Sequence, residues 1–179
     1  MLSLVTNAVC NELSKGIEKS VMELTGTKIE INMKIKTNVA PEKLITSLSR
    51  SELVVAIYSL FTDYKLHGII LLDISSARKL SEILLLQAEL EISDEEALDA
   101  LKEFGNIVFG TLAAVISNKI GGKVIYTIPE VIIDYDVAIL DSLVTPIAIV
   151  KDYVELFEFE VIPEEAEALN FKMLLMAGE

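Results

Sequence analysis

The chain has 179 residues, of which 52% are hydrophobic, so it is long and apolar enough to bury a sizeable core. Its 28 acidic and 15 basic side chains give a net charge of −13, which repels phosphate backbones and anionic membrane surfaces. Arginine occurs only at Arg50 and Arg78, and no lysine cluster alternates with aromatic residues. We therefore expect no nucleic acid partner.

Cysteine usage and the amino terminus indicate where the protein resides. The lone Cys10 cannot form an internal disulfide, as is usual in a reducing compartment. The first residues lack a basic start followed by an apolar run, and no apolar stretch approaches the roughly 20 residues that span a bilayer. We expect a cytoplasmic protein without membrane insertion.

The first half of the chain predicts a helix, a strand, a hairpin and a second helix. Apolar residues recur at helical intervals from about residue 3 to 24, and Gly26 ends this helix. The strand KIEINMKI follows at once. Between residues 52 and 74, two runs rich in branched and aromatic residues surround the turn-forming sequence TDYKLHG, which favours an antiparallel hairpin. Helical spacing resumes from 76 to 86.

The second half predicts a long helix followed by strands. The sequence SDEE at 93–96 is a capping-box pattern, so a helix is expected to begin there. It should continue to about residue 120, where a Gly-Gly pair supplies a left-handed stop. The segment KVIYTIP and the runs near 137 and from 147 to 162 predict strands. Pro163 is expected to open a final helix.

The two halves resemble each other at an offset of about 95 residues. TGTKIEINMKI at 25–35 matches IGGKVIYTIPE at 120–130 in glycine, lysine and apolar alternation. Downstream, the segment that begins VAIYSLF parallels the one that begins IAIVKDY, after a small gap. No linker separates the halves, so we interpret the chain as one domain, 1–179, with pseudo-repeats at about 1–92 and 93–179. Short connections suit hairpins, which predicts an α+β fold with a mostly antiparallel sheet covered by helices.

The long second helix presents two unlike sides. At 100° per residue its apolar side chains cluster on one broad side, which is expected to face the core. The opposite strip carries Asp99, Lys102, Glu103, Asn106, Gly110, Ala113 and Ser117. A glycine inside a helix costs roughly 1 kcal/mol relative to alanine. The small residues after Asn106 therefore indicate a face that another surface approaches closely.

Glu103 and Asn106 stand three residues apart, so their side chains project from one helix face and can address one small group together. They belong to the longer spacing Asp99-x3-Glu103-x2-Asn106-x22-Pro129. The structural alternative is that Gly110 only permits helix packing, that Glu103 is a solvated charge and that Asn106 bonds a neighbouring loop.

The first repeat provides an internal control for this alternative. It has Ala8 where Glu103 stands and Lys34 where Pro129 stands, although Asn11 matches Asn106. If the fold alone required the pattern, the first helix would be expected to keep it. The difference favours a function at the second helix.

These residues resemble the signature of the CheC, CheX and FliY phosphatases of chemotaxis, which is Asp or Ser-x3-Glu-x2-Asn-x22-Pro. Every defined position matches. The flanking Gly-Asn-Ile-x-x-Gly, the strand KVIYTIPEV and the hairpin pattern before each helix extend the resemblance over nearly the whole chain. The resemblance implies duplicated helix, strand and hairpin units that share a mostly antiparallel sheet, with two long helices on one face.

The same resemblance implies hydrolysis of the aspartyl phosphate on a CheY-like response regulator, which terminates chemotaxis signalling. The partner would supply the phosphorylated Asp, a Lys and Mg²⁺, and Asn106 would hold water in line with the phosphorus while Glu103 pairs with that Lys. Asp99 and Pro129 would frame the site without a chemical step. Four residues would form the partner-docking face, namely Lys102, Gly110, Ala113 and Ser117. With one histidine and one cysteine, we expect no intrinsic metal or cofactor.

The chain departs from the two-site CheC pattern. Ala8 removes the acidic half of the first site, so Asn11 is left in a degenerate site and one active site is expected. A single site is CheX-like, whereas the length and the carboxy-terminal sequence resemble CheC, and the subfamily stays open. The competing interpretation is a non-catalytic adaptor that binds a response regulator, a CheD-like deamidase or a flagellar switch component. Homo-oligomerisation is left open.

Overall fold

The protein folds around one six-stranded antiparallel sheet, in the order β1-β5-β6-β3-β2-β4. The structure is a computed structural model that describes residues 7–163 and 169–177. The strands are β1 (Ile29–Val39), β2 (Leu53–Phe61), β3 (Leu66–Asp73), β4 (Glu130–Tyr135), β5 (Val154–Pro163) and β6 (Phe171–Ala177). The helices are α1 (Asn7–Thr25), α2 (Pro41–Leu48), α3 (Ile74–Leu85), α4 (Glu95–Ile120) and α5 (Asp136–Val150), with a 3-10 turn η2 (Thr62–Tyr64). The predicted α+β class is confirmed.

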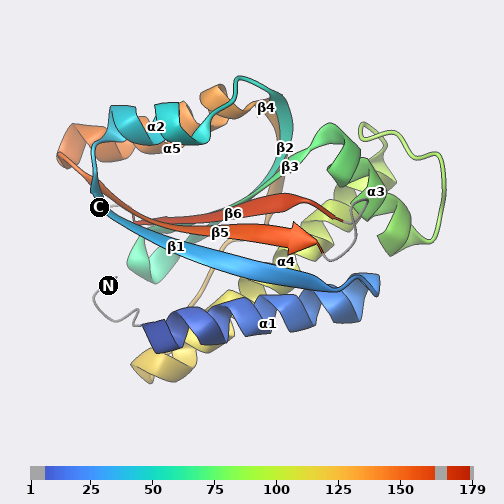
Figure 1. The fold of residues 1–179 in the computed structure, drawn as a ribbon, viewed down its shortest axis with the longest axis horizontal. Helices are drawn as coiled ribbons and strands as arrows, with labels where there is room; N and C mark the ends of the chain where they lie inside the picture. Colours follow the sequence, from blue (N-terminus) through green and yellow to red (C-terminus); the bar gives the residue numbers. More distant parts are fainter. Residues whose placement is uncertain (1–6, 164–168, 178–179) are drawn as a thin grey trace.

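Helices cover both faces of this sheet (Figure 1). The long helices α1 and α4 pack against each other on one face together with α3, and α2 packs against α5 on the other. Two separate core clusters result, because side chains alternate along each strand. On β2, for example, Val55 and Ile57 join the α4 cluster, whereas Val54 and Ala56 join the α5 cluster.

The order of elements repeats along the chain. The series α1-β1-α2-β2-β3 is followed, after α3, by α4-β4-α5-β5-β6. In the sheet, β3 and β6 lie side by side at the centre, β2 and β5 flank them, and β1 and β4 form the two edges. Strands from both predicted repeats therefore belong to one sheet, while the division near residue 92 stays a prediction.

Several predicted elements are wrong in the second half. Residues 137 and 147–150 belong to α5 rather than to strands, because a continuous apolar run shows no period that separates a buried strand from a buried helix. The repeat consequently pairs β2 with VELFEFEVIP of β5, not with IAIVKDY. Pro163 is the last residue of β5, the residues 164–168 that would begin the predicted final helix lie outside the described part, and 171–177 form β6 rather than a helix.

One short helix was missed in the first half. The sequence PEKLITSL forms α2 and buries Leu44 and Leu48 against the sheet. Proline at its first position is a helix-start signal, since the missing N–H needs no partner there. The length of eight residues is too short for a clear period.

Gly105 sets how closely α4 crosses the sheet. An added Cβ at this position would overlap Cγ2 of Ile57 on β2 and would lie 3.4 Å from Cβ of Pro129. Both Gly105 and Pro129 are buried. The helix can therefore lie against β2 and against the start of β4 only because residue 105 has no side chain.

Gly105→Ala is expected to lower the free energy of unfolding by about 1–3 kcal/mol, because overpacking outweighs the better helix propensity of alanine. Chemical denaturation measures this loss. Gly122→Ala is the matched control, since its Cβ would have no neighbour nearer than 3.8 Å. A Gly105→Ala protein as stable as the wild type would contradict the close crossing.

Candidate active site

Helix α4 carries the candidate site on its open side. Asp94 precedes the helix, Glu95 and Glu96 occupy its first turn, and Gly121 ends it in a left-handed conformation with φ of 66°. The predicted capping box at Ser93 is wrong by one residue, because Asp94 is the N-cap and its carboxylate instead accepts the Glu91 N–H at 3.0 Å. Among the described helices, α4 alone is long and apolar enough to cross a membrane, and its apolar side packs into the core.

Glu103 and Asn106 are both exposed on the open side of α4. The Tyr126 hydroxyl donates to Oδ1 of Asn106 at 3.0 Å and lies 3.1 Å from the Asn106 main-chain oxygen. Sequence reasoning did not select Tyr126. Its signal was present, because it is the sole aromatic residue between the glycine pair and Pro129.

The Tyr126 hydroxyl keeps its proton at neutral pH. Partial burial raises the pKa of Tyr126 above its ordinary value, and the negative charge of Glu103 raises it further. The hydroxyl therefore acts as a hydrogen-bond donor toward Asn106 throughout the physiological range. The site joins an ionisable carboxylate, a neutral amide and a neutral phenol within one turn of α4 and its flanking segment.

The framing residue Asp99 pairs with Lys102, with its Oδ1 at 2.9 Å from the lysine Nζ. Both side chains are about half exposed, so the pair contributes little stability. It does hold the Lys102 ammonium toward the previous turn of α4. Within the described part of the chain, Glu103 forms no ion pair, and its carboxylate is open to a cation from outside.

The small residues of the predicted docking face lie against the protein's own chain. A Cβ at Gly110 would stand 3.1 Å from the Tyr126 hydroxyl, and the Ser117 hydroxyl accepts the Val124 N–H at 3.1 Å. Ala113 is only 6% exposed and belongs to the core, so its placement on the docking face is wrong. Lys102 is exposed, as predicted.

The segment 123–129 covers this part of α4 because the edge of β2 holds it there. The Thr62 N–H donates to Ile125 O at 3.0 Å and the Thr127 N–H donates to Leu60 O at 2.9 Å. A single bridge joins Phe61 and Tyr126, so most of KVIYTIP is not the regular strand that was predicted. The helical pattern could not show which surface approaches α4, since the contacting residues are 7 to 20 positions away in sequence.

The degenerate first site lacks these supporting groups. Asn11 is exposed on α1, but the residue in the position of Tyr126 is Ile31, which is buried in β1. Lys34, in the position of Pro129, instead pairs with Glu160 at 2.8 Å. No hydroxyl is available from these positions to hold Asn11.

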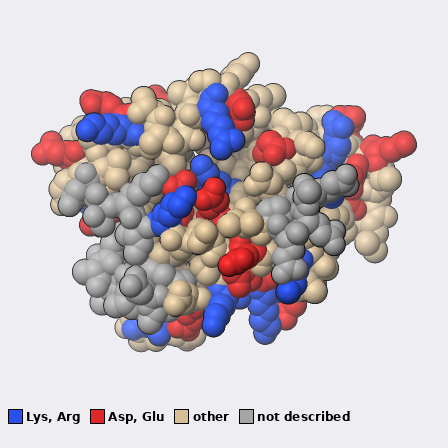
Figure 2. All heavy atoms as spheres, in the orientation of Figure 1, with Lys and Arg blue, Asp and Glu red and all other residues tan. Residues whose placement is uncertain are grey.

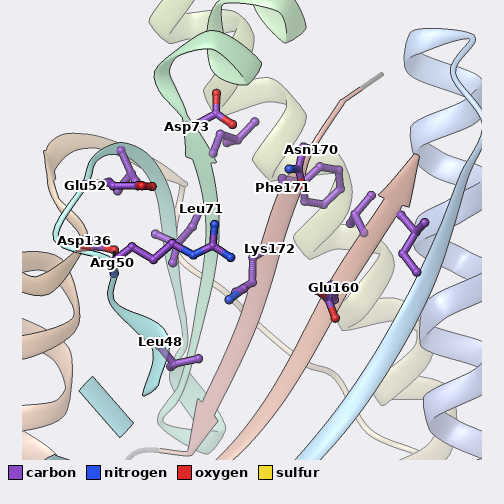
Figure 3. Close-up of a pocket in the computed structure, with 14 residues that line it drawn as sticks. Leu48, Arg50, Glu52, Leu71, Asp73, Asp136, Glu160, Asn170, Phe171 and Lys172 are labelled. Carbon is purple, nitrogen blue, oxygen red and sulfur yellow. Dashed lines mark hydrogen bonds between the residues drawn. The ribbon is translucent and has the colours of Figure 1, made fainter. Parts of the chain in front are cut away.

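A cavity of about 330 Å³ lies on the opposite side of the sheet, near α2 and α5, and none of the motif residues lines it. Arg50 and Lys172 extend toward each other across it (Figure 3). Lys172 pairs with the buried Glu158 at 3.2 Å, and the lining Glu160 pairs with Lys34. These ion pairs join β1, β5 and β6, and we interpret them as structural.

Asp136 anchors the wall of the same cavity. It is only 5% exposed and accepts the Arg50 N–H and the Ser49 hydroxyl, at 2.6 and 2.7 Å. Burial raises the pKa of Asp136, but these hydrogen bonds, with others from the Val137 and Glu52 N–H groups, outweigh burial and hold the pKa below its ordinary value. The carboxylate ties the turn before β2 to the start of α5.

The lowered pKa of Asp136 predicts a pH-dependent contribution to stability. Since the unfolded state binds the proton more tightly, the contribution is complete at neutral pH and is lost as the pH falls below about 4. Asp136→Asn is expected to lower the free energy of unfolding by about 1–3 kcal/mol at pH 7, with a gap that narrows toward pH 3. Denaturant titrations across this range measure it, with the exposed Asp152→Asn as control. A difference in unfolding free energy that stayed constant across this pH range would refute the stabilising role of the ionised Asp136.

Two further features bear on the chemistry of the surface. The described residues contain no group of three His, Cys, Asp or Glu side chains arranged for a metal. His67 lies in β3, where its Nδ1 is 3.0 Å from the Tyr58 hydroxyl, and burial lowers the pKa of His67. On the face shown in Figure 2, acidic and basic side chains are interspersed, without one extended basic area.

Solved structures share this fold. The FliY protein of Thermotoga maritima has a TM-score of 0.70 at 19% identity, over 96% of this chain and 86% of that chain. The CheX protein of Vibrio vulnificus gives 0.62 at 12% identity, over 96% and 99%. The FliM middle domain of Vibrio alginolyticus gives 0.61 at 11% identity, over 95% and 90%. The protein thus has the fold of the CheC-like chemotaxis and flagellar switch proteins. A comparison with curated protein sequences found no match.

The family follows from the sequence itself. The family model described as chemotaxis phosphatase CheX matches residues 54–150, more than half of the chain, from β2 through α4 to the end of α5. The matched region contains Glu103, Asn106, Tyr126 and Pro129. The chain belongs to the CheX family, which confirms the predicted relationship to the CheC, CheX and FliY group.

Proposed function

We propose that this protein is a phosphatase that hydrolyses the aspartyl phosphate of a CheY-like response regulator and thereby ends a chemotaxis signal. The observation that carries the proposal is the open face of α4, where a carboxylate without an ion pair in the described part of the chain and an amide held by a tyrosine stand three residues apart. Membership of the CheX family supports it. A cytoplasmic location follows, since response regulators act there.

In this proposal the regulator supplies the reactive group and the metal. The phosphorylated Asp, a Lys and Mg²⁺ belong to the partner, and this chain completes the site by docking. Glu103 forms a charge-assisted hydrogen bond with the partner's Lys and fixes the docking register. The open carboxylate fits this role, because Lys102 is held by Asp99.

Asn106 positions the attacking water. Its Oδ1 accepts a hydrogen bond from the water, whose oxygen forms a bond to phosphorus as the bond from phosphorus to the aspartyl oxygen breaks. The electron pair leaves on the aspartyl carboxylate, and the water proton passes to the released phosphate. An acyl phosphate is already reactive, so placement of the water is the main task, and an amide performs it without a change of ionisation.

The direct test is phosphate release from a phosphorylated CheY-like protein. Wild-type protein is expected to accelerate release, whereas Glu103→Ala and Asn106→Ala are each expected to remove most of the acceleration. Decay unchanged by the wild type with several regulators, or full activity in both variants, would exclude this mechanism.

The second candidate is a non-catalytic adaptor. The FliM structures among the structural neighbours favour it, one of which is a complex of FliM with FliG. A response regulator, a CheD-like deamidase or a flagellar switch component would be its partner. Equal capture of a partner by wild type and Asn106→Ala, with no phosphatase activity in either, would favour the adaptor.

A further inference from the structure

We infer that Tyr126 is a positioning residue for Asn106, and that Gly110 provides the space in which Tyr126 lies. This inference deepens the proposed phosphatase function and rests on it. It assigns a role to the residue that sequence reasoning missed, and it identifies the group for which the helix-interior glycine leaves space.

The Tyr126 hydroxyl contacts both the side chain and the main chain of Asn106. An exposed asparagine would otherwise sample several rotamers. Here one phenol lies 3.0 Å from the side-chain Oδ1 and 3.1 Å from the main-chain oxygen of the same residue. These two contacts define the orientation of the amide relative to its own backbone. Oδ1 has two lone pairs, so one stays available for water while Tyr126 occupies the other.

Tyr126 is itself held in place. Its ring packs against Phe61, with centroids 5.7 Å apart and an angle of 37° between the planes. Its main chain is fixed on both sides, through Ile125 O and the Thr127 N–H, to the end of β2. The amide is therefore tied through the tyrosine to the sheet. Such preorganisation reduces the ordering required when the partner docks.

Gly110 lies about one helical turn after Asn106 on α4. A Cβ there would stand 3.1 Å from the Tyr126 hydroxyl, closer than ordinary van der Waals contact. A side chain at 110 would therefore require the hydroxyl to shift by a few tenths of an ångström, which would disturb its contacts with Asn106. The cost of a glycine in the helix interior, roughly 1 kcal/mol relative to alanine, is consistent with a functional reason for keeping it.

The first repeat allows a comparison within the chain, because it has other residues at the positions of the glutamate, the glycine and the tyrosine. Where the glutamate is replaced by Ala8, the positions of Gly110 and Tyr126 hold Lys15 and Ile31. Asn11 stays, but neither the hydroxyl nor the space for it does. The glutamate, the tyrosine and the glycine are thus absent together in the degenerate copy.

The test compares Tyr126→Phe, which removes only the hydroxyl, with Tyr153→Phe, the same change at an exposed tyrosine remote from the site. Steady-state turnover is measured on a phosphorylated CheY-like regulator. The melting temperature of each variant is measured by thermal unfolding, and the side-chain amide signals of Asn106 are followed by NMR. We expect Tyr126→Phe to lower kcat about tenfold with KM within about twofold, and Tyr153→Phe to change neither. Gly110→Ala keeps both the Tyr126 hydroxyl and the Asn106 amide but crowds them, and it is expected to lower kcat roughly threefold.

The outcomes separate this inference from the proposed function. An inactive wild type would refute the phosphatase, while the Asn106 amide signals would still report whether removal of the hydroxyl frees the amide. An active wild type with kcat unchanged in Tyr126→Phe would overturn the positioning role and leave the phosphatase intact. Parallel losses of kcat, substrate affinity and melting temperature would also overturn it, because they would indicate a structural role only.

Discussion

Asn106→Ala is expected to reduce turnover of a phosphorylated CheY-like regulator by about 100-fold or more while leaving association within about twofold. The amide contributes only when water is in line with phosphorus, so its removal weakens the transition state rather than the docked complex. The Asn106 side chain is exposed, and in the variant the Tyr126 hydroxyl can donate to solvent water instead of to the lost amide. The free energy of unfolding should therefore change little. Single-turnover phosphate release measures the rate, and titration with the unphosphorylated regulator measures binding.

Asn118→Ala is the matched control for this prediction. Asn118 lies on the same helix and is exposed like Asn106, but it lies about three turns further along α4, away from the pair of Glu103 and Asn106. It should retain full activity. Comparable rates for Asn106→Ala and Asn118→Ala would remove Asn106 from the chemistry.

Glu103→Lys is expected to weaken association with the regulator at least tenfold, a loss of about 1.4 kcal/mol or more. The change replaces attraction to the partner's Lys with repulsion between two ammonium groups. Because the chain carries a net charge of −13 and CheY-like partners are often acidic, long-range steering is weak and this local contact should dominate. Isothermal titration or surface plasmon resonance at two ionic strengths measures the effect.

The control for Glu103→Lys is Glu23→Lys on α1. It changes the net charge by the same amount at an exposed position whose weak pair is with Lys19, at 3.7 Å. Binding should be almost unchanged by it. If Asn106→Ala and Glu103→Lys lost affinity equally, the division between a docking carboxylate and a positioning amide would be wrong.

The candidate site was predictable where its parts lie on one helix. Glu103 and Asn106 share a face of α4 because three residues span nearly one turn, which any helix of this sequence would reproduce. The same reasoning failed for Ala113, which is buried. The boundary between the exposed and buried sides depends on how α4 lies against the sheet, and Gly105 sets that approach through contacts with Ile57 and Pro129.

The elements of the fold likewise divide into those that local sequence predicts and those that depend on tertiary packing. The hairpin of β2 and β3 and the helices α1, α3 and α4 follow from local period and turn residues. Within α5, the runs near 137 and from 147 to 150 were wrongly predicted to form strands, because a continuous apolar sequence satisfies both conformations. In the folded protein both runs belong to the one helix α5, which packs against α2 and has Asp136 in its first turn.

By itself, the sequence determined the family, the α+β class and the pairing of Glu103 with Asn106, since these depend on spacing within single elements. Tertiary structure alone decided which surface meets Gly110 and Ser117. The sequence pattern indicated a close approach to α4, and the approaching surface is the chain's own segment 123–129, brought back by hydrogen bonds to β2. Such contacts join residues that no helical period connects. For this reason the contact between Tyr126 and Asn106, 20 residues apart in sequence, could be recognised only in the folded protein.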